Sequence, residues 1–445
     1  MAFAIVTCEL NAAITTAIDG LRVTGQASQY IMRGPDVPGV RRFEIKDLNP
    51  LGCRGAPPPF VLSRCTKAVN RQIRWPEMKI GYISHNLNDP AVERRCRMLN
   101  RGGAKVALAG FCRDPAVAAA PAARDPMLLG QSQDANLLRR ALETVRSAVF
   151  TKALVRRFAD CDVIMARNLE QLAIAYAIAG DRPIVYECLD VHRLLTGSGK
   201  AASLIRAIEG RLLAKVDLLL TSSPGFVRNH FTQRPVRAPI AIIENKLLID
   251  DDVQVDARPA APELPVRIGW FGMLRCKRTL AFLTELVERA DGRVEVLIAG
   301  KPSPAELPDI TEKIGAVRGM TFHGSYHYDD LPELYGRCHF AWTIDWFEEG
   351  LNSSWLLPNR LYEALAHGAI PIALTDVETG RWLAAHDCGL LVDRAPDAAK
   401  RLATMAPSEI TGMQQRVSAL DRRELMADSR DCQDLVNTIG ATLRA

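Results

Sequence analysis

Several signatures that would place a protein in a class at once are missing from this sequence. No uninterrupted apolar run reaches about 18 residues, and the start MAFAIVTCELNAAITTAIDG has no basic stretch before its apolar part. We therefore expect neither secretion nor membrane spanning, but a cytoplasmic protein. None of the eleven cysteines has the close spacing of a zinc knuckle or redox pair, so we expect reduced thiols that mostly fill cores.

Motifs of three common enzyme classes are also absent. There is no G-x-G-x-x-G of a Rossmann dehydrogenase and no G-x-S-x-G of a hydrolase. The string TGSGKAAS over 196–203 resembles a phosphate loop, but Leu194 stands where its first glycine belongs and Ala201 replaces the required Ser or Thr. His323 and His327 fall in one loop rather than on one helix face, so we expect no metal site.

What is present is the composition of a globular enzyme. The 445 residues are 48% hydrophobic and 24% charged, and their length favours two main domains. The net charge of +5, from 56 basic and 51 acidic side chains, is too mild to imply nucleic-acid binding. Residues 1–77 are turn-rich, with three prolines in a row at 57–59, and show no alternation of strands and helices.

From Met78 onward, apolar strand patterns alternate with helical patterns, as in 79–84, 105–111 and 182–192, and the alternation restarts at 266–272. This predicts the α/β class, with two Rossmann-like domains facing across a cleft and ligands at the carboxyl ends of the strands. The predicted limits are a poorly ordered extension over 1–77, an N-terminal domain over 78–250, a linker over 251–265, a C-terminal domain over 266–400, and C-terminal helices over 401–445 that pack back on the N-terminal domain.

The stretch WLLPNRLYEALAHGAIPIA over 355–373 predicts a phosphate-binding helix. Pro358 suits its first turn and Gly368 its end, before a buried strand. Such a helix start attracts a phosphate through its free N–H groups and dipole. Arg360 can add charge-assisted hydrogen bonds, and Glu363, one turn on, can accept hydrogen bonds from ribose hydroxyls.

This stretch resembles the donor-site helix of GT-B glycosyltransferases, especially the retaining enzymes of glycosyltransferase family 4. A second stretch, GWFGMLRCKRTL, resembles the family's glycine followed by basic residues that hold the donor pyrophosphate. The resemblance implies a GT-B fold, a nucleotide-sugar co-substrate with no cofactor, and metal-independent transfer with retention. The donor-binding residues it implies are Gly272, Arg275, Lys277, Arg278, Asn352, Ser353, Arg360 and Glu363, with Arg275 and Arg278 favoured among the cations.

The sequence departs from the family where the pattern has a first glutamate, because Trp355 occupies that place. The task of contacting the transferred sugar is then expected to pass to the preceding loop, at Asp345, Glu348, Glu349 or Asn352. In the first domain, the resemblance implies that His192 lies beside the donor phosphates, with Asp190 near it. The predicted catalytic residues are His192, Asp190 and Asp345, and His85 and Asp89 are predicted to meet the acceptor.

The resulting hypothesis is a glycosyltransferase that moves a sugar to a saccharide or a polyprenyl-diphosphate-linked oligosaccharide in exopolysaccharide or capsule assembly. Arginine-rich stretches such as AVERRCRMLNRGGAK suit peripheral docking on the anionic inner face of a membrane, although a solvated face explains them equally well. Two alternatives stay open, a GT-B-fold nucleotide-sugar epimerase and an inactive nucleotide-sugar-binding partner.

Overall fold

The computed structural model describes residues 61–62, 77–112, 125–131, 151–191, 193–197, 199–250, 255, 257 and 259–444. The predicted N-terminal extension therefore lies almost wholly outside the described residues. By its contacts the chain divides into two compact units. The first comprises Met1–Thr221, His230–Ile242 and Gln433–Ala445, and the second comprises Ser222–Asn229 and Ile243–Cys432. The domain limits drawn from the sequence remain predictions.

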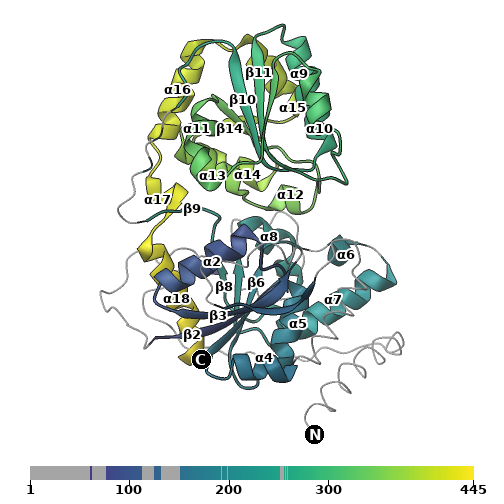
Figure 1. The fold of residues 1–445 in the computed structure, drawn as a ribbon, viewed down its shortest axis with the longest axis vertical. Helices are drawn as coiled ribbons and strands as arrows, with labels where there is room; N and C mark the ends of the chain where they lie inside the picture. Colours follow the sequence, from purple (N-terminus) through teal and green to yellow (C-terminus); the bar gives the residue numbers. More distant parts are fainter. Residues whose placement is uncertain are drawn as a thin grey trace. The chain divides into compact units, whose positions relative to one another are not determined.

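The first unit is built on a parallel sheet, with helices packed around it (Figure 1). Its eight described strands run in the order β1-β8-β7-β6-β5-β2-β3-β4. They are β1 (Val61–Leu62), β2 (Lys79–Ser84), β3 (Lys105–Cys112), β4 (Met127–Gln131), β5 (Val163–Arg167), β6 (Ile184–Cys188), β7 (Leu218–Thr221) and β8 (Ile240–Ile242). The helices between them include α2 (Pro90–Arg101), α4 (Thr151–Arg157), α5 (Leu169–Ile178), α6 (Arg193–Thr196) and α7 (Lys200–Leu213).

The second unit holds a second parallel sheet, in the order β12-β11-β10-β13-β14-β15. Its strands are β10 (Val266–Leu274), β11 (Val294–Pro302), β12 (Met320–Gly324), β13 (Phe340–Trp342), β14 (Ile370–Leu374) and β15 (Leu390–Val392). Helices α9 (Lys277–Arg289), α10 (Ile310–Gly315), α11 (Leu331–Gly336), α12 (Asn352–Trp355), α13 (Asn359–Ala366), α14 (Glu378–Ala385), α15 (Ala395–Thr404), α16 (Pro407–Ser418) and α17 (Arg422–Leu425) also belong to it.

Two further pieces complete these units. Helix α8 (Pro224–Asn229) follows β7 but is counted with the second unit, which also holds a small sheet of β9 (Leu247–Leu248) and β16 (Met426–Ala427). Helix α18 (Ser429–Gly440) passes into the first unit.

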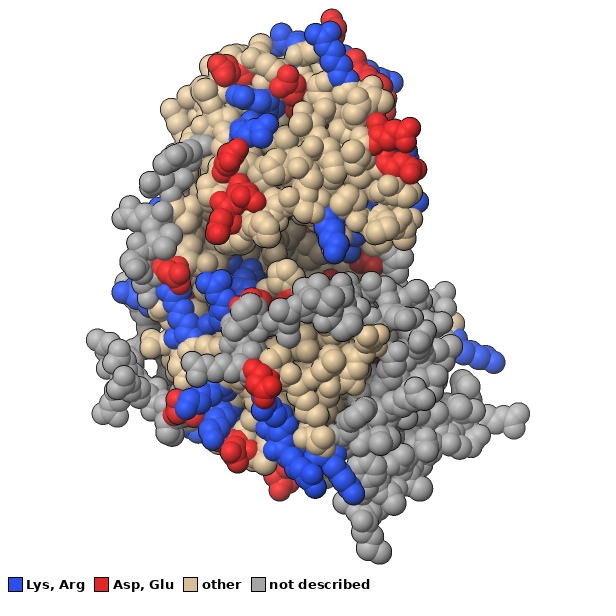
Figure 2. Space-filling model, in the orientation of Figure 1, with Lys and Arg blue, Asp and Glu red and all other residues tan. Residues whose placement is uncertain are grey.

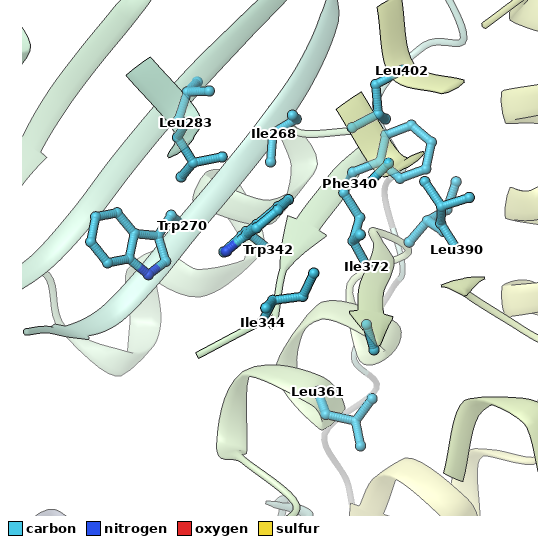
Figure 3. Packing of buried hydrophobic residues seen from close by; sticks show 14 of the residues in the cluster. Ile268, Trp270, Leu283, Phe340, Trp342, Ile344, Leu361, Ile372, Leu390 and Leu402 are labelled. Carbon is cyan, nitrogen blue, oxygen red and sulfur yellow. The ribbon is translucent and has the colours of Figure 1, made fainter. Parts of the chain in front are cut away.

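The core of the second unit explains why its strands read as continuous apolar runs. Trp270, Trp342 and Phe340 are almost wholly buried between the sheet and its helices, beside Ile268 and Leu361 (Figure 3). A parallel sheet covered by helices has no solvated face, so both sides of each strand are apolar. This is the pattern from which the sequence predicted the α/β class, and the two parallel sheets confirm it.

The described elements differ from the predicted ones at several places. Strand β4 was not predicted, and α12 forms within a stretch that was read as a loop. Helix α13 begins at Asn359, and Pro358 is the N-cap residue before its first turn rather than part of it, because its ψ of 153 is extended although its φ of −73 would suit a helix. The eight cysteines of the described residues are buried, as expected for core fillers.

Candidate functional site

The carboxyl end of β10 is shaped by two glycines. Gly272 has φ +108, and a Cβ on the facing Gly300, whose φ is +142, would lie 1.8 Å from the Gly272 carbonyl oxygen. Only glycine permits this approach and these dihedrals. The chain leaves β10 there and reaches Arg275 just before α9, so Arg275 stands at the edge of the sheet where ligands of parallel sheets bind.

Arg275 is held by the loop that follows the neighbouring strand β13. Its Nη2 lies 4.0 Å from Asp345 Oδ2, and its guanidinium lies 4.5 Å from the centre of the Phe347 ring. The other Asp345 oxygen accepts a hydrogen bond from the Phe347 backbone N–H at 2.9 Å. Asp345 thus fixes its own loop with one oxygen and faces Arg275 with the other.

The other two predicted cations lie on α9. Arg278 packs 4.4 Å from the Trp346 ring and pairs with Glu349 at 2.8 Å, with both charged side chains more than half exposed. Lys277 pairs instead with Glu306 at 3.3 Å. Arg275 and Arg278 therefore contact the same loop, residues 345–349, whereas Lys277 contacts Glu306 outside this loop.

Asn352 and Ser353 form hydrogen bonds with Glu348, in the loop that precedes α12. The Asn352 side-chain amide is buried and donates to Glu348 Oε2 at 2.7 Å, and Ser353 Oγ accepts from the Glu348 N–H at 3.1 Å. Both side chains stabilise the turn into α12, and their role at the donor stays a prediction.

Helix α13 follows the loop after β13 and precedes β14, and β13 is paired and parallel with β10, so its first turn belongs to the same carboxyl edge of the sheet as the end of β10. Arg360 and Glu363 are half-buried in its first two turns, and the Tyr335 hydroxyl donates to Glu363 Oε2 at 3.4 Å. Tyr326, beyond β12, lies within their electrostatic reach: burial and Glu363 raise the pKa of its hydroxyl, while Arg360 lowers it.

Trp355 packs against α8 rather than carrying polar chemistry. Its carbonyl oxygen accepts a hydrogen bond from Ser223 Oγ at 2.5 Å, and its ring meets the Phe226 ring edge-on at 6.5 Å. Arg228, further along α8, pairs with the buried Glu378 of α14.

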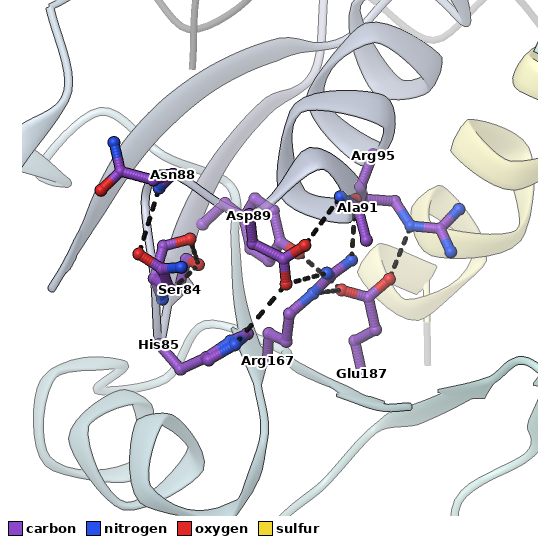
Figure 4. A network of polar contacts seen from close by, with 10 residues as sticks. Ser84, His85, Asn88, Asp89, Ala91, Arg95, Arg167 and Glu187 are labelled. Carbon is purple, nitrogen blue, oxygen red and sulfur yellow. Dashed lines mark hydrogen bonds and ion pairs between the residues drawn. The ribbon is translucent and has the colours of Figure 1, made fainter. Parts of the chain in front are cut away.

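In the first unit, a buried ionic network lies at the carboxyl ends of β5 and β6 (Figure 4). Glu187 is fully buried and accepts hydrogen bonds from Arg95 Nε at 2.6 Å, Arg167 Nε at 2.7 Å and the Tyr82 hydroxyl at 2.6 Å. Burial alone would raise the pKa of the Glu187 carboxyl, but Arg167 and Arg95 outweigh it and lower this pKa to about 2.

The predicted acceptor residues lie at the rim of this network. Asp89 Oδ1 accepts from the Ala91 N–H at 2.9 Å and so caps α2, while Oδ2 lies 3.7 Å from Arg167 Nη1 and 3.6 Å from His85 Nε2. The structure thus brings His85 and Asp89 together at one edge of the sheet (Figure 4).

The remaining predicted catalytic residues follow β6. Asp190 is exposed just beyond this strand, and its carbonyl oxygen accepts from Cys188 Sγ at 3.6 Å. His192 lies outside the described residues.

The partners that organise these sites were not predicted. Arg95 was expected on an exposed basic face, either solvated or docked on a membrane, but it is only 2% exposed. Arg167 and Glu187 stand inside otherwise apolar strand patterns, and a charge at such a position is the signal that could have indicated a buried pair. The rings of Trp346 and Phe347 were not predicted to contact the arginines.

The comparisons with known proteins agree with this architecture. The succinoglycan biosynthesis protein ExoL of Rhizobium meliloti (strain 1021) is 40% identical over 385 residues, which cover 83% of this chain and 95% of that protein. The chain belongs to the GT-B glycosyltransferases of exopolysaccharide biosynthesis. No family model matches the chain.

Solved structures show the same fold for this glycosyltransferase at low identity. A sucrose-phosphate synthase from Thermosynechococcus elongatus aligns with a TM-score of 0.60 at 15% identity, over 82% of this chain and 100% of the other. HepE from Anabaena, in complex with UDP and glucose, aligns with a TM-score of 0.58 at 14% identity and the same coverage. Both support the GT-B fold with two Rossmann-like domains.

Among the described residues, no group of three or more His, Cys, Asp or Glu side chains could hold a metal ion. Nor does any helix there have the length and apolar character needed to cross a bilayer.

Proposed function

We propose that the glycosyltransferase binds a nucleotide-diphosphate sugar at the carboxyl edge of the second unit's sheet and transfers the sugar to an acceptor hydroxyl. One observation carries the donor site: Arg275, after β10, and Arg360 and Glu363, in α13, share this edge of one parallel sheet. HepE has been solved with UDP and with UDP-glucose, so uridine nucleotides are the first donors to test.

In this site, the diphosphate lies at Gly272, where the absence of a Cβ lets the backbone approach the phosphates. Arg275 supplies charge from one side, and Arg360 and the N–H groups of the first turn of α13 supply it from the other. Glu363 accepts hydrogen bonds from the ribose hydroxyls. Arg278, the other favoured cation, is paired with Glu349. It can bind the phosphates only when this ion pair breaks.

Metal independence is part of the proposal. When the bond to the anomeric carbon breaks, negative charge grows on the leaving β-phosphate. Arg275, Arg360 and the dipole of α13 can offset this charge, which is the role that a divalent cation would otherwise have. Transfer should then proceed at an unchanged rate in the presence of a chelator.

The acceptor that we propose is a polyprenyl-diphosphate-linked oligosaccharide, with His85 and Asp89 on its side of the reaction. ExoL is a succinoglycan biosynthesis protein, which supports a polysaccharide precursor as the acceptor. Retention at the anomeric carbon follows from the resemblance to family 4, and Asp190, His192 and Asp345 keep their predicted catalytic roles. The configuration at the anomeric carbon of the product can be measured by NMR from the coupling constant of its anomeric proton.

We also propose peripheral docking on an anionic membrane surface. Figure 2 shows Lys and Arg side chains in groups on the described surface, with acidic side chains among them. In the first unit, Arg97, Lys152 and Arg156 are exposed. Cosedimentation with vesicles that contain anionic lipid should fall as salt rises, and absence of binding at low salt would contradict the docking.

The donor site is tested by binding of UDP and UDP-glucose to the variants Arg275→Gln and Glu363→Gln. Each variant removes one charge-assisted interaction worth about 1.5–3 kcal/mol, so calorimetry should show roughly tenfold to hundredfold weaker binding. Arg289→Gln and Glu285→Gln are matched controls, because these side chains form an exposed pair at 2.7 Å elsewhere on α9.

Wild-type affinity in either site variant would refute its assigned role. Incubation of the donor alone separates transfer from epimerisation, and the comparisons favour neither the epimerase nor the inactive binding partner.

A further inference from the structure

Glu363, the carboxylate that we assign to the ribose, is hydrogen-bonded to a side chain that lies in neither donor-site motif. The Tyr335 hydroxyl, from α11, donates to Glu363 Oε2 over a separation of 28 residues in the sequence. At 3.4 Å this bond is longer than the usual O–H···O distance of about 2.5–3.0 Å. Hydrogen bonds between functional groups are often long in the free protein and shorten when the ligand binds. The contact therefore connects Tyr335 to the proposed donor site.

The position of this hydroxyl is fixed by packing. Tyr335 is only 1% exposed and belongs to the core cluster that also contains Phe271 and Ala364. Its ring lies edge-on to the Phe271 ring, with the ring centres 4.8 Å apart. It also stacks on the His367 ring, with the centres 6.0 Å apart and an angle of 16° between the planes. A buried ring with these neighbours cannot change rotamer without losing close-packed contacts, so the hydroxyl keeps one position relative to α13.

The chemistry of a phenol suits a partner of this carboxylate. Burial and the charge of Glu363 raise the pKa of the Tyr335 hydroxyl well above its usual value, so the hydroxyl stays a proton donor. Because the hydroxyl is neutral, it orients the carboxylate without cancelling its charge. A carboxylate has about four lone-pair sites, so one hydrogen bond from Tyr335 leaves sites for both hydroxyls of a ribose. Tyr335 and a ribose can therefore bind Glu363 at the same time.

We propose that Tyr335 is a positioning residue for the donor, because its hydroxyl orients Glu363 to accept hydrogen bonds from the 2′- and 3′-hydroxyls of the nucleotide ribose. A glutamate side chain that is already oriented loses less conformational entropy when the ligand binds. This inference rests on the proposed donor site and assigns a partner to one of its residues. It makes the preference for ribose over deoxyribose depend on a residue that acts through Glu363.

The experiment measures binding of UDP, GDP and ADP to the wild type by calorimetry. The diphosphate that binds most tightly is then compared with its 2′,3′-dideoxy form, which keeps the base and the phosphates but lacks both ribose hydroxyls. Tyr335→Phe should weaken binding of the ribose form about threefold to tenfold, less than the loss of Glu363 itself. Binding of the dideoxy form should change less than about twofold, because the contact that Tyr335 supports is absent from it.

The ratio of the two affinities separates positioning from a structural role, because a displaced helix would weaken both forms alike. Tyr362→Phe is the matched control and should keep wild-type affinity for both forms. Tyr362 is also buried, but it belongs to the core cluster around Trp270, with its ring edge-on to Trp382 at 5.8 Å. In a Glu363→Ala background, Tyr335→Phe should weaken binding by less than about a further twofold. Circular dichroism should show that both Tyr→Phe variants are folded.

The outcomes distinguish this role from the donor site itself. If the wild type binds none of the three diphosphates or does not prefer the ribose form, or if Glu363→Ala keeps wild-type affinity, the proposed donor site fails and this role fails with it. If the wild type prefers the ribose form and Glu363→Ala weakens it, but Tyr335→Phe keeps its affinity within about twofold, only the positioning role is overturned. Equal weakening of both forms by Tyr335→Phe would overturn that role as well.

Discussion

Glu187→Gln should destabilise the first unit far more than its single-atom change suggests. The side chain keeps its size but loses the charge that compensates Arg95 and Arg167, which are each 2% exposed. Removing one partner of a buried ion pair costs about 3–5 kcal/mol, because the other charge stays buried. The lowering of the Glu187 pKa from 4.5 to about 2 gives a similar figure, roughly 3 kcal/mol, at about 1.4 kcal/mol per unit.

The sign of the pH dependence follows from the same shift. Because folding lowers the pKa of this carboxyl, its stabilising contribution is present above about pH 4.5 and is lost as the pH falls toward 2. The wild-type free energy of unfolding should therefore fall over this interval, and that of Glu187→Gln should fall less.

The assay can follow the two units separately. Five of the six tryptophans, at 270, 342, 346, 355 and 382, belong to the second unit. The sixth, Trp75, lies outside the described residues, so the assay uses a Trp75→Phe background. In a urea titration, far-UV circular dichroism reports both units, whereas fluorescence of these tryptophans reports the second. The variant should shift the dichroism transition to lower urea more than the fluorescence transition.

A matched control is Glu285→Gln, which removes one charge from an exposed pair on α9 and should change stability by less than about 0.5 kcal/mol. A loss below about 1 kcal/mol in Glu187→Gln would refute the argument that the buried arginines depend on this carboxylate.

Three further predictions concern the second unit. Gly300→Ala places a Cβ 1.8 Å from a backbone oxygen and should cost more than about 3 kcal/mol in urea unfolding, whereas Gly315→Ala, with nothing within 4 Å, should not destabilise. Burial lowers the pKa of His367 from 6.5 to about 4, so the fluorescence-monitored unit should lose up to roughly 3 kcal/mol as the pH falls through this range, and His367→Gln should lose less. Phe347→Leu removes the ring beneath Arg275 and should weaken UDP binding about twofold to fivefold in calorimetry; unchanged affinity would show that the ring does not position the guanidinium.

The fold could be predicted from the sequence because both sheets are parallel and buried. Strand β2 was predicted with its observed limits, since its apolar run ends where the chain leaves the sheet. Strand β13 was predicted over 339–345 but spans Phe340–Trp342, because Thr343 and the residues after it turn into the loop that Asp345 stabilises. Periodicity measures burial, and it cannot show where a buried chain stops pairing.

The sites could be predicted only in part. Arg360 and Glu363 could be proposed as site residues because they lie close together on one helix beside a recognisable turn. The partners of Glu187 lie 20 residues away at Arg167 and 92 residues away at Arg95, so only the folded sheet brings them together. Likewise, no local pattern connects Arg275 with Phe347, which belongs to the loop after another strand.

Trp355 shows why a missing motif residue need not mean a missing function. A Cβ on Gly225 would lie 2.2 Å from the Trp355 carbonyl oxygen, so the backbones of α8 and α12 pack in direct contact at this point. The family's acid would have to occupy a position whose ring packs edge-on against Phe226 and whose backbone binds Ser223. A charge there would lose its hydration against apolar surface, which is unfavourable unless it is paired. An acid that contacts the transferred sugar is therefore better placed in the preceding loop. Of the candidates in this loop, Asp345 lies beside Arg275, the residue that we propose to bind the donor phosphates.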